Sequence, residues 1–556
     1  PIEQMIRVVP EGEKRTAPDP AATAGNAIAP RPAESGGFPL PTAQLHSSLA
    51  SARHDYRILR GPGGSFDLAR LVPSGLQDSD ESTSSGAPPW APWSSLAPSS
   101  TTGGGAGPVL LALPLRFGGF SSELIQSYAP VFRSLGFEPA AGGILSGGPL
   151  GSSVGTSLTG ESEEAAARAS QAAAAAVEPG SMISLFLVRG DLNLNADCTV
   201  TLRQGNQVYA CGHRLLLAGP SEIPFAPSSV LATVSSLASS FKLDAPLDAV
   251  AGSIRQDRFA AIYGVLGEKA GLIPVRLHLD STLNTQSDYN FELVRDPFLS
   301  PFLLNLAVVS TLSASERMVG PSTLEIKGKF SLSSGDSIDI DDVVSAEMNT
   351  AGGAGLAVAA PLSYVLASGF PDLSVQGVDL SIVAVNELRQ ASIEQVWSTK
   401  SEVRPGDRID VMAVLRTPSG ESVTTKIPVT IPDSITDKNL SLEVGSGSTI
   451  NALENRLTSL ATPPRDVRQL VRALNRMRRN NRVYALLMAP QRSLVIQGDE
   501  YPSPPPSLVQ TLMADPGASG SVVFSGSSVV GDFETKASPY MIRGEKTLLL
   551  KVGGGS

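Results

Sequence analysis

Two cysteines, Cys198 and Cys211, are the only ones in this chain of 556 residues, and they flank a segment with the alternating pattern of a β-hairpin. If Gln204-Gly205 forms the two-residue turn, Cys198 lies opposite Cys211 at a non-hydrogen-bonded position, where Cα atoms are about 4.5 Å apart. This register predicts a disulfide, and closing its loop of about 14 residues would stabilise the fold by about 3 kcal/mol. The alternative is two buried free thiols, because two cysteines and one nearby histidine are too few for a zinc site.

A histidine follows the second cysteine, in Ala210-Cys-Gly-His213. A neutral imidazole can take a proton from a serine hydroxyl, which is the first step of acyl transfer to a serine nucleophile. The preceding glycine would let a substrate backbone come close. The alternative is a histidine that only ends the hairpin. The other histidines (His46, His54 and His278) are scattered and have no metal-ligand spacing.

Two charged clusters occur further along the chain. An acidic run over residues 336–342 departs from the Asp-x-Asp-x-Asp-Gly pattern of a calcium loop, which favours a solvated turn. Arginines at steps of three or four residues form one basic stripe on a predicted helix. The stripe could meet an acidic partner, an anionic glycan or a lipid headgroup, but in a chain of net charge −10 pairing with the protein's own carboxylates is favoured. Its members are Arg465, Arg468, Arg472, Arg476 and Arg479.

Composition limits the elements that can position these residues. Glycine and proline are frequent, at 53 and 43 residues, whereas charged residues make up 17% and aromatic residues 5%. This balance excludes a coiled coil, a collagen and a highly charged disordered protein, and it indicates a strand-rich body with low-complexity segments. The acidic net charge gives no support for wholesale nucleic-acid binding. The longest apolar runs, 109–115 and 302–309, are shorter than the ~18 residues of a transmembrane helix.

Changes in pattern divide the chain. Residues 1–108 are rich in Pro, Ala, Ser and Gly. Because such a segment buries too little apolar surface to offset its ordering entropy, it is predicted to be largely a linker with one short ordered patch. Helices are predicted over Ser121–Leu135, with a Ser cap and a following Gly, and over the alanine-rich Glu161–Val177. The predicted divisions are 1–108, 109–370 with a core motif region at 178–278, 371–447, 448–552 and a flexible tail at 553–556.

Period-two alternation predicts strands beyond residue 181. Alternating apolar residues at 409–415 and 423–431 are separated by Thr417-Pro-Ser-Gly420, which predicts a half-buried hairpin within an immunoglobulin-like β-sandwich at 371–447. Two helices are predicted at 449–460 and 464–479, followed by C-terminal strands.

Several motif pieces between Glu178 and His278 occur in one order. This series resembles the stage IV sporulation protein B peptidase domain, a family of trypsin-like serine peptidases, most clearly as it occurs in large secreted bacterial proteins. The resemblance implies a trypsin-like β-barrel, and the downstream region is similar to the companion region of those proteins. The pieces are Pro179-Gly-Ser, Leu187-Val-Arg-Gly-Asp191, Thr199-Val-Thr201, Ala210-Cys-Gly-His213, Ser239-Ser-Phe-Lys-Leu243, Ile254-Arg-Gln-Asp-Arg258 and Ile262-Tyr-Gly264.

The resemblance implies that His213 is the catalytic base, because the histidine of the Gly-His motif has that role in the family. Cys198 and Cys211 stand where the family usually has a glycine and an aromatic residue. The family's nucleophile motif, Gly-Met-Ser-Gly-Ser-Pro, is not present as such; in the larger members it lies shortly before a Thr-Pro-Ile-Glu-Gln-Met-type stretch, and this chain opens Pro1-Ile-Glu-Gln-Met5. The resemblance therefore implies that the nucleophile lies just upstream of Pro1, either cut off by self-cleavage or left out where this sequence begins.

One substitute for that nucleophile lies within the chain. Gly517-Ala-Ser519-Gly-Ser521 has the same Gly-x-Ser-Gly-Ser skeleton, which makes Ser519 a candidate nucleophile, although Gly/Ser-rich loops also produce this skeleton by chance. Asp257 is the candidate to orient His213, with a structural ion pair in Arg255-Gln-Asp-Arg258 as the alternative.

These observations together predict a mainly β protein, α+β overall: a trypsin-like β-barrel peptidase domain, an immunoglobulin-like β-sandwich and a short helical segment. The resemblance implies a secreted, self-processing serine peptidase of a bacterium, and the disulfide implies an oxidising compartment, which is the periplasm or the cell surface. It would need no cofactor or metal, and its partners would be a polypeptide substrate or its own upstream fragment, besides a protein partner or a second copy. The competing function is a catalytically inactive extracytoplasmic scaffold or assembly subunit, supported by the absent serine motif, the long linker and the sandwich.

Overall fold

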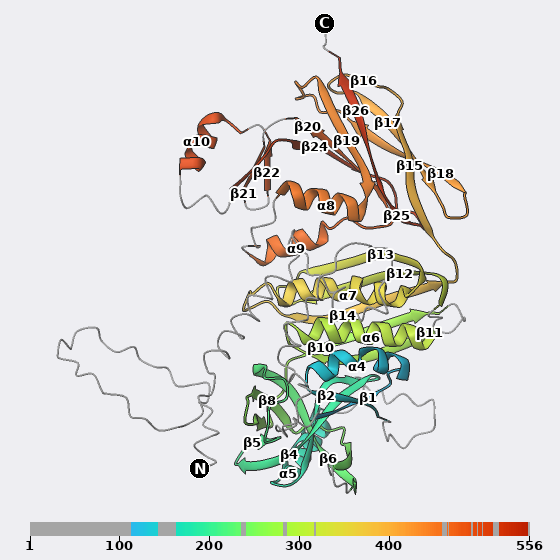
Figure 1. Ribbon diagram of the computed structural model, residues 1–556. Coiled ribbons are helices and arrows are strands. Elements are labelled where there is room, and N and C mark those ends of the chain that lie inside the picture. Colours follow the sequence, from blue (N-terminus) through green and yellow to red (C-terminus); the bar gives the residue numbers. More distant parts are fainter. Residues whose placement is uncertain are drawn as a thin grey trace, which may run out of the picture. The chain divides into compact units, whose positions relative to one another are not determined.

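The computed structural model describes residues 113–142, 163–234, 241–281, 286–315, 319–458, 464, 466–490, 493–496, 499–502, 504–514 and 522–553 (Figure 1). All of them belong to the second of two compact units, Gly61–Ser556. The segment 1–108, Ser519 and the last three residues of the expected tail lie outside the described residues. The described part is mainly β, as the composition and alternation predict.

Six antiparallel strands close into a barrel in the order β3-β6-β8-β9-β5-β4, and the ring is completed by the pairing of β3 with β4. Closure leaves no free edge in this part of the sheet. Ile183, Leu185, Ala196 and Val200 are fully buried and belong to one hydrophobic core. The barrel strands are β3 (Met182–Gly190), β4 (Asn193–Gln204), β5 (Gln207–Ala210), β6 (Gly219–Val234), β8 (Gly252–Asp257) and β9 (Ile262–Leu266).

The sheet continues on both sides of the barrel. On one side it runs from β3 through β11, β10, β14 and β12 to β13, and on the other from β4 through β1 to β2, while β7 pairs with β6. The β10–β14 and β1–β2 pairs are parallel, and the other pairs in this sheet are antiparallel. The added strands are β1 (Leu113–Gly118), β2 (Phe137–Ala141), β7 (Phe241–Pro246), β10 (Leu272–Asp280), β11 (Gln286–Val294), β12 (Val319–Leu332), β13 (Ser337–Met348) and β14 (Val375–Val385).

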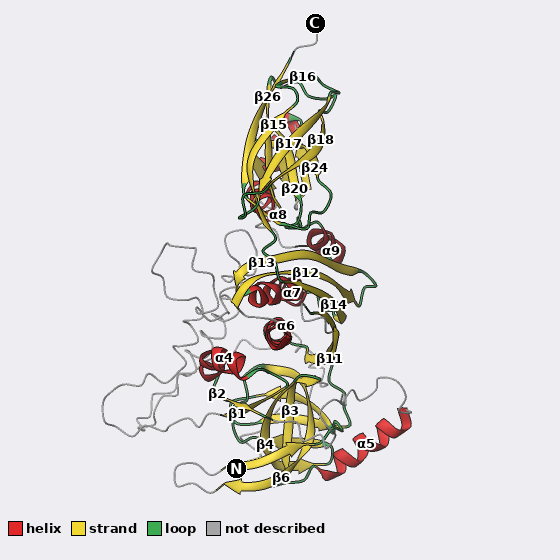
Figure 2. Ribbon diagram, turned by 90° about the vertical axis from the view of Figure 1, so that its right-hand side faces the viewer, coloured by secondary structure: helices red, strands yellow, loops and turns green. Residues whose placement is uncertain are grey.

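Two buried helices, α6 (Leu299–Ser315) and α7 (Thr350–Leu366), pack against each other and against the β11–β13 side of the sheet (Figure 2). Neither helix is predicted by periodicity, because a helix that is apolar on all sides has no amphipathic pattern. Their close approach depends on Gly355, where a Cβ atom would lie 2.7 Å from Asn305 Nδ2 and 2.8 Å from Val309 Cγ2.

The helix predicted at 121–135 is α4 (Ser122–Ser134), which begins at the Ser121 cap and packs on β2. The Tyr128 hydroxyl on α4 donates to Asn305 Oδ1 of α6 at 3.3 Å, and burial raises the pKa of Tyr128 to about 12. The alanine-rich helix is α5 (Glu163–Ala176), largely exposed, with Ala173 buried.

Two further sheets share a second hydrophobic core and form a β-sandwich (Figure 2). The predicted hairpin is confirmed, since Arg416 pairs with Ser422 and Ile409 with Val429. One sheet has the order β18-β17-β15-β25 and the other β16-β26-β19-β20-β24. The strands are β15 (Gln390–Ser398), β16 (Glu402–Val403), β17 (Arg408–Arg416), β18 (Ser422–Thr430), β19 (Asn439–Ser446), β20 (Val483–Ala489), β24 (Ser528–Glu534), β25 (Met541–Arg543) and β26 (Glu545–Val552).

The sandwich differs in extent from the predicted segment 371–447. The first strand of that segment, β14, pairs with β10 and β12 of the large sheet, and four strands from beyond residue 447 complete the sandwich. Strand pairing between segments far apart in the chain leaves no mark in local alternation, so the boundaries follow from the tertiary structure alone. The remaining elements are α8 (Gly447–Thr458), α9 (Val467–Asn475), β21 (Ser493–Ile496), β22 (Asp499–Pro502), α10 (Pro506–Ala514) and β23 (Val522–Ser525).

Two asparagine side chains cover the outer edge of β13. Asn475 Oδ1 accepts from the Asp339 N–H at 3.0 Å, and its Nδ2 donates to the Ser337 carbonyl at 2.9 Å. Asn480 Oδ1 accepts from the Val343 N–H at 2.9 Å. The amides thus supply the hydrogen bonds of a neighbouring strand, which protects an edge that would otherwise be open to pairing.

Candidate functional site

His213 lies in the loop of residues 211–218 that joins β5 to β6, and its side chain is exposed. Its Nδ1 is 2.7 Å from the Arg214 carbonyl oxygen. Because a carbonyl oxygen only accepts, Nδ1 carries the proton of the neutral ring and Nε2 keeps a free lone pair. The loop therefore presents an imidazole whose tautomer is set for accepting a proton at Nε2.

The predicted disulfide between Cys198 and Cys211 is present, with the two Cα atoms 4.7 Å apart. The register that brings the cysteines together differs from the predicted one. The turn is Gly205-Asn206 rather than Gln204-Gly205, because Gln204 pairs with Gln207. A bulge between Val200 and Leu202 then moves the register back by one residue, and the Cys211 N–H donates to the Thr199 carbonyl at 3.1 Å.

The loop holds residues in the left-handed backbone region. Cys211 has φ 70° and Leu217 has φ 61°, beside Gly212 and Gly219 with φ 69° and 75°. This conformation costs a residue with a side chain roughly 1–2 kcal/mol. Surrounding contacts must therefore hold the loop in place.

Asp257, at the end of β8, is one such contact, and it is fully buried. Its carboxylate accepts hydrogen bonds from the backbone N–H groups of Leu215 at 2.8 Å, Leu216 at 2.6 Å and Ala218 at 3.1 Å. The carboxylate thus binds the backbone of the loop that follows His213, whereas the contact of the imidazole Nδ1 is with the Arg214 carbonyl.

The arginines that flank Asp257 in sequence have other partners. Arg255 forms ion pairs with Glu222 at 3.1 Å and Glu268 at 3.2 Å, and Arg258 donates to the Gln256 side chain. The candidate nucleophile Ser519 lies outside the described residues. Within the described ranges, no group of three or more His, Cys, Asp or Glu side chains could hold a metal ion. None of the described helices is long and apolar enough to cross a membrane.

The arginines around α9 divide into two groups. Arg479 pairs with Asp341 at 3.4 Å, whereas Arg468, Arg472 and Arg476 are exposed, and Arg465 lies outside the described residues. Of the acidic run, Asp336 lies in the β12–β13 turn, and Asp339, Asp341 and Asp342 lie on β13.

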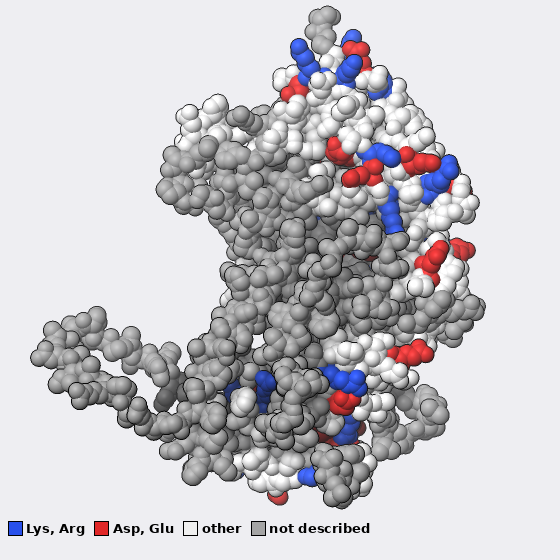
Figure 3. Space-filling view, in the orientation of Figure 1, with Lys and Arg blue, Asp and Glu red and all other residues white. Residues whose placement is uncertain are grey.

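The surface of the β-sandwich carries charges of both signs. On the face seen in Figure 3, Lys and Arg side chains are interspersed with Asp and Glu over this region. Cross-strand ion pairs join Lys426 to Asp410 at 2.6 Å and Arg416 to Glu394 at 2.7 Å. Such pairs make this face an ordinary solvated surface.

A buried cluster joins β1 to the barrel. The Arg116 guanidinium on β1 pairs with Asp197 of β4 at 2.9 Å and with Asp244 of β7, and the side chains of the two acids are 7% and 0% exposed. Two buried carboxylates thus share one cation. Burial raises the pKa of Asp197 to about 6, and the Asp244 carboxylate acts in the same direction.

We expect Asp197→Asn to flatten the pH dependence of stability. An aspartate in the unfolded chain has a pKa near ~3.9, so between about pH 4 and pH 6 the folded protein binds more protons at Asp197 than the unfolded chain does. The free energy of unfolding therefore falls as the pH rises through this window, by up to about 3 kcal/mol. The variant should match the parent near pH 4 and be more stable at pH 7, as measured by urea unfolding.

Asp410→Asn is the matched control, because Asp410 is a half-exposed surface partner of Lys426 and should leave the slope unchanged. A slope in Asp197→Asn equal to that of the parent would refute the prediction. The Asp342 carboxyl, whose pKa burial also raises to about 6, should account for the fall that remains.

The candidate site therefore consists of three parts: His213, the Cys198–Cys211 disulfide and the Asp257 carboxylate. The carboxylate binds the part of the loop that runs from His213 to the start of β6. The chain matches no family model, no curated protein and no solved structure, so the function is argued from this geometry.

Proposed function

We propose that this chain supplies the general base of a secreted serine peptidase, and that His213 is that base. The observation that carries the proposal is the hydrogen bond from His213 Nδ1 to the Arg214 carbonyl, which leaves Nε2 free on an exposed ring. The nucleophilic serine would come from a segment outside the described residues, with Ser519 as the candidate within the chain, or from a separate polypeptide.

In the proposed mechanism, His213 Nε2 takes the proton from the serine Oγ as Oγ forms a bond to the carbonyl carbon of the substrate. The imidazolium then gives this proton to the leaving amine as the peptide C–N bond breaks. Water, deprotonated by the same nitrogen, hydrolyses the acyl-serine. Asp257 and the disulfide would keep the loop from moving between these steps.

The disulfide supports an extracytoplasmic location for this chemistry. The bridge lies two residues before His213, and structural disulfides persist in oxidising compartments. The trypsin-like identity of the barrel and the immunoglobulin-like identity of the sandwich belong to the same proposal. They are supported by the closed six-stranded antiparallel barrel and the two-sheet sandwich, respectively.

The test is labelling of material purified from its native source with a fluorophosphonate, which reacts with activated serines. We expect His213→Gln to lower the labelling rate of the peptidase serine by about 100-fold or more, since general base catalysis contributes about 10²–10⁴. Lys400→Gln, an exposed cation of the sandwich, is the control and should label as the parent does.

Mapping of the labelled peptide locates the serine. Label at Ser519 or on a co-purifying polypeptide, lost in His213→Gln, supports the proposal. If neither carries a His213-dependent label, the scaffold function replaces the peptidase.

A further inference from the structure

A row of polar side chains crosses three neighbouring strands on the outer face of the large sheet. On β10, residues 275, 277 and 279 are buried, and the residues that alternate with them, 276, 278 and 280, lie on the outer face of the sheet. His278 lies on this outer face. Asp288 of β11 is directly opposite it on one side, and Ser381 of β14 is in register with it on the other. An acid, an imidazole and a hydroxyl thus stand on adjacent strands, in that order.

The contact with Asp288 determines which ring nitrogen of His278 carries the proton. His278 Nδ1 is 2.7 Å from Asp288 Oδ1, and a carboxylate oxygen accepts the proton that Nδ1 carries. Nε2 is then the free nitrogen, and Ser381 lies on the side of β10 away from Asp288. Neighbouring strands are about 4.8 Å apart, and a site built on this row requires Ser381 Oγ to turn toward His278 Nε2.

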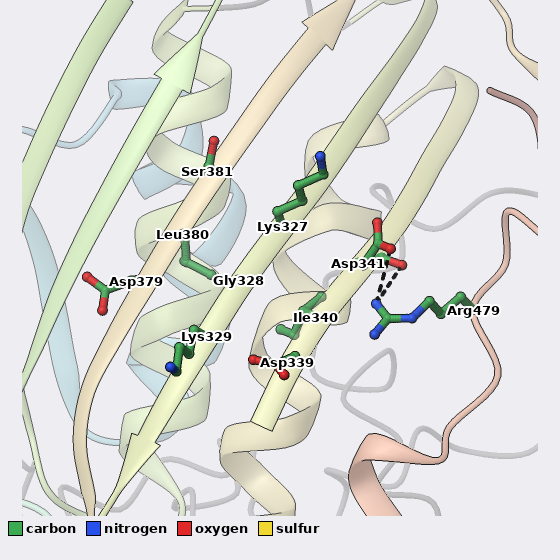
Figure 4. A pocket seen from close by; sticks show the side chains of 10 residues that line it. All are labelled: Lys327, Gly328, Lys329, Asp339, Ile340, Asp341, Asp379, Leu380, Ser381 and Arg479. Atoms are coloured by element: carbon green, nitrogen blue, oxygen red, sulfur yellow. Dashed lines mark hydrogen bonds and ion pairs between the residues drawn. The ribbon is translucent and has the colours of Figure 1, made fainter. Parts of the chain in front are cut away.

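A cation follows the serine on the next strand. Lys327 of β12 is in register with Ser381, and both residues line a hollow of about 480 Å³ (Figure 4). An ammonium group beside the nucleophile can stabilise the negative charge that develops on a carbonyl oxygen under attack. The hollow is open to solvent, and its lining includes Ser381 and Lys327 but not His278 or Asp288.

We propose that Ser381, His278 and Asp288 form a second acyl-transfer site, which acts on esters of small carboxylic acids. Ser381 Oγ forms a bond to the ester carbonyl carbon while its proton passes to His278 Nε2. The ester C–O bond then breaks, and the leaving alkoxide takes that proton. Water hydrolyses acyl-Ser381 with the same nitrogen as base, which releases the carboxylic acid and restores the serine.

The openness of the face determines the class of substrate. The side chains of His278 and Asp288 are 41% and 74% exposed, so the acyl group would meet solvent on this side of the serine. Charges of both signs line the hollow, including Lys327, Lys329 and Asp339. Small, water-soluble acyl esters fit these surroundings, and the site is independent of His213.

The test uses p-nitrophenyl acetate with the full chain. We expect a burst of nitrophenolate and acetylation of Ser381, detected by peptide mass mapping. Hydroxylamine should remove this acetyl group, because it cleaves an ester and leaves an acetylated lysine intact. Ser381→Ala should abolish the burst, His278→Gln should slow acylation by about 100-fold, and Asp288→Asn should slow it less.

Two controls match these variants. Ser422→Ala removes an exposed serine of β18, and Asp410→Asn removes a half-exposed carboxylate of β17 that pairs with Lys426; both should keep the parent's burst. Each variant is compared with the parent by circular dichroism, and if Ser381→Ala is misfolded, His278→Gln decides the question.

A Ser381→Ala protein that is folded and as reactive as the parent would overturn the proposal, as would acetylation confined to lysines. Repeating the assay in His213→Gln separates the two sites. An unchanged burst there supports an independent site, and a lost burst assigns the esterase reaction to His213 and overturns the proposal.

Discussion

Asp257→Ala is expected to lower the free energy of unfolding by about 4 kcal/mol. The substitution removes the acceptor for three backbone N–H groups, of Leu215, Leu216 and Ala218. Hydrogen bonds to a charged group contribute about 1.5–3 kcal/mol each, and a buried donor left without an acceptor carries the full cost of its desolvation. Because Leu216 is half-buried and Ala218 is exposed, water can replace part of what is lost at those two groups. Urea denaturation measures the change.

The same substitution should also weaken any activity that depends on His213. Without the carboxylate, the N–H groups of Leu216 and Ala218, on either side of Leu217, lose their acceptor. The left-handed conformation of Leu217 is then held less firmly, and we expect the loop that carries the imidazole to relax. Asp257→Asn, which keeps one acceptor oxygen, should fall between the parent and the alanine variant. Asp410→Ala is a surface control with an expected change below about 1 kcal/mol. A loss for Asp257→Ala no larger than this control would show that the buried carboxylate does not hold the loop.

Removal of the disulfide is expected to have the second large effect. Cys198→Ala/Cys211→Ala should lower the free energy of unfolding by about 3 kcal/mol, the value for a loop of about 14 residues in the chain-entropy model. The measurement is thermal or urea unfolding with and without a reducing agent. The parent should lose stability on reduction, and the variant should be indifferent to it. A parent that is equally stable in both conditions would contradict the prediction.

A second pair of substitutions separates the covalent bond from the backbone conformation. Cys211 is left-handed, with φ 70°, so alanine at this position keeps the unfavourable conformation. Cys198→Ala/Cys211→Gly removes the same bridge but lets the backbone adopt that conformation freely, and it should recover up to about 1 kcal/mol of the loss. If the glycine variant is less stable than the alanine variant, the left-handed conformation at 211 is not a source of strain.

Local pattern predicted much of the secondary structure. The cap at Ser121, the alternation on both sides of Thr417–Gly420 and the pairing of the two cysteines depend on residues close together in the chain, and each is present. The cysteine register was wrong in detail because the turn lies one residue later than predicted and because a bulge, which has no reliable sequence signal, then shifts the pairing by one residue. The helices α6 and α7 were missed because uniform burial leaves no amphipathic period.

The candidate site was predicted only in part. His213 and Asp257 could be chosen from sequence, but the backbone N–H groups that face Asp257 come from a loop about 40 residues away, whose left-handed turns are not encoded by a recognisable motif. Ser381 and His278 are separated by about 100 residues, and no spacing rule connects them. They become neighbours because β10 and β14 pair in parallel. The chain between these two strands forms β11, α6, β12, β13 and α7.

The amino-acid sequence by itself determined the mainly β class, the caps and hairpins, and the disulfide between Cys198 and Cys211. Each of these follows from composition or from contacts between residues that are close together in the chain. Only the tertiary structure decided that β14 leaves the sandwich for the large sheet, that Asp257 binds a backbone loop, and that an acid, an imidazole and a hydroxyl share one row. Each of these depends on the order of strands in a sheet, which is set by the burial of whole apolar faces and not by any local pattern.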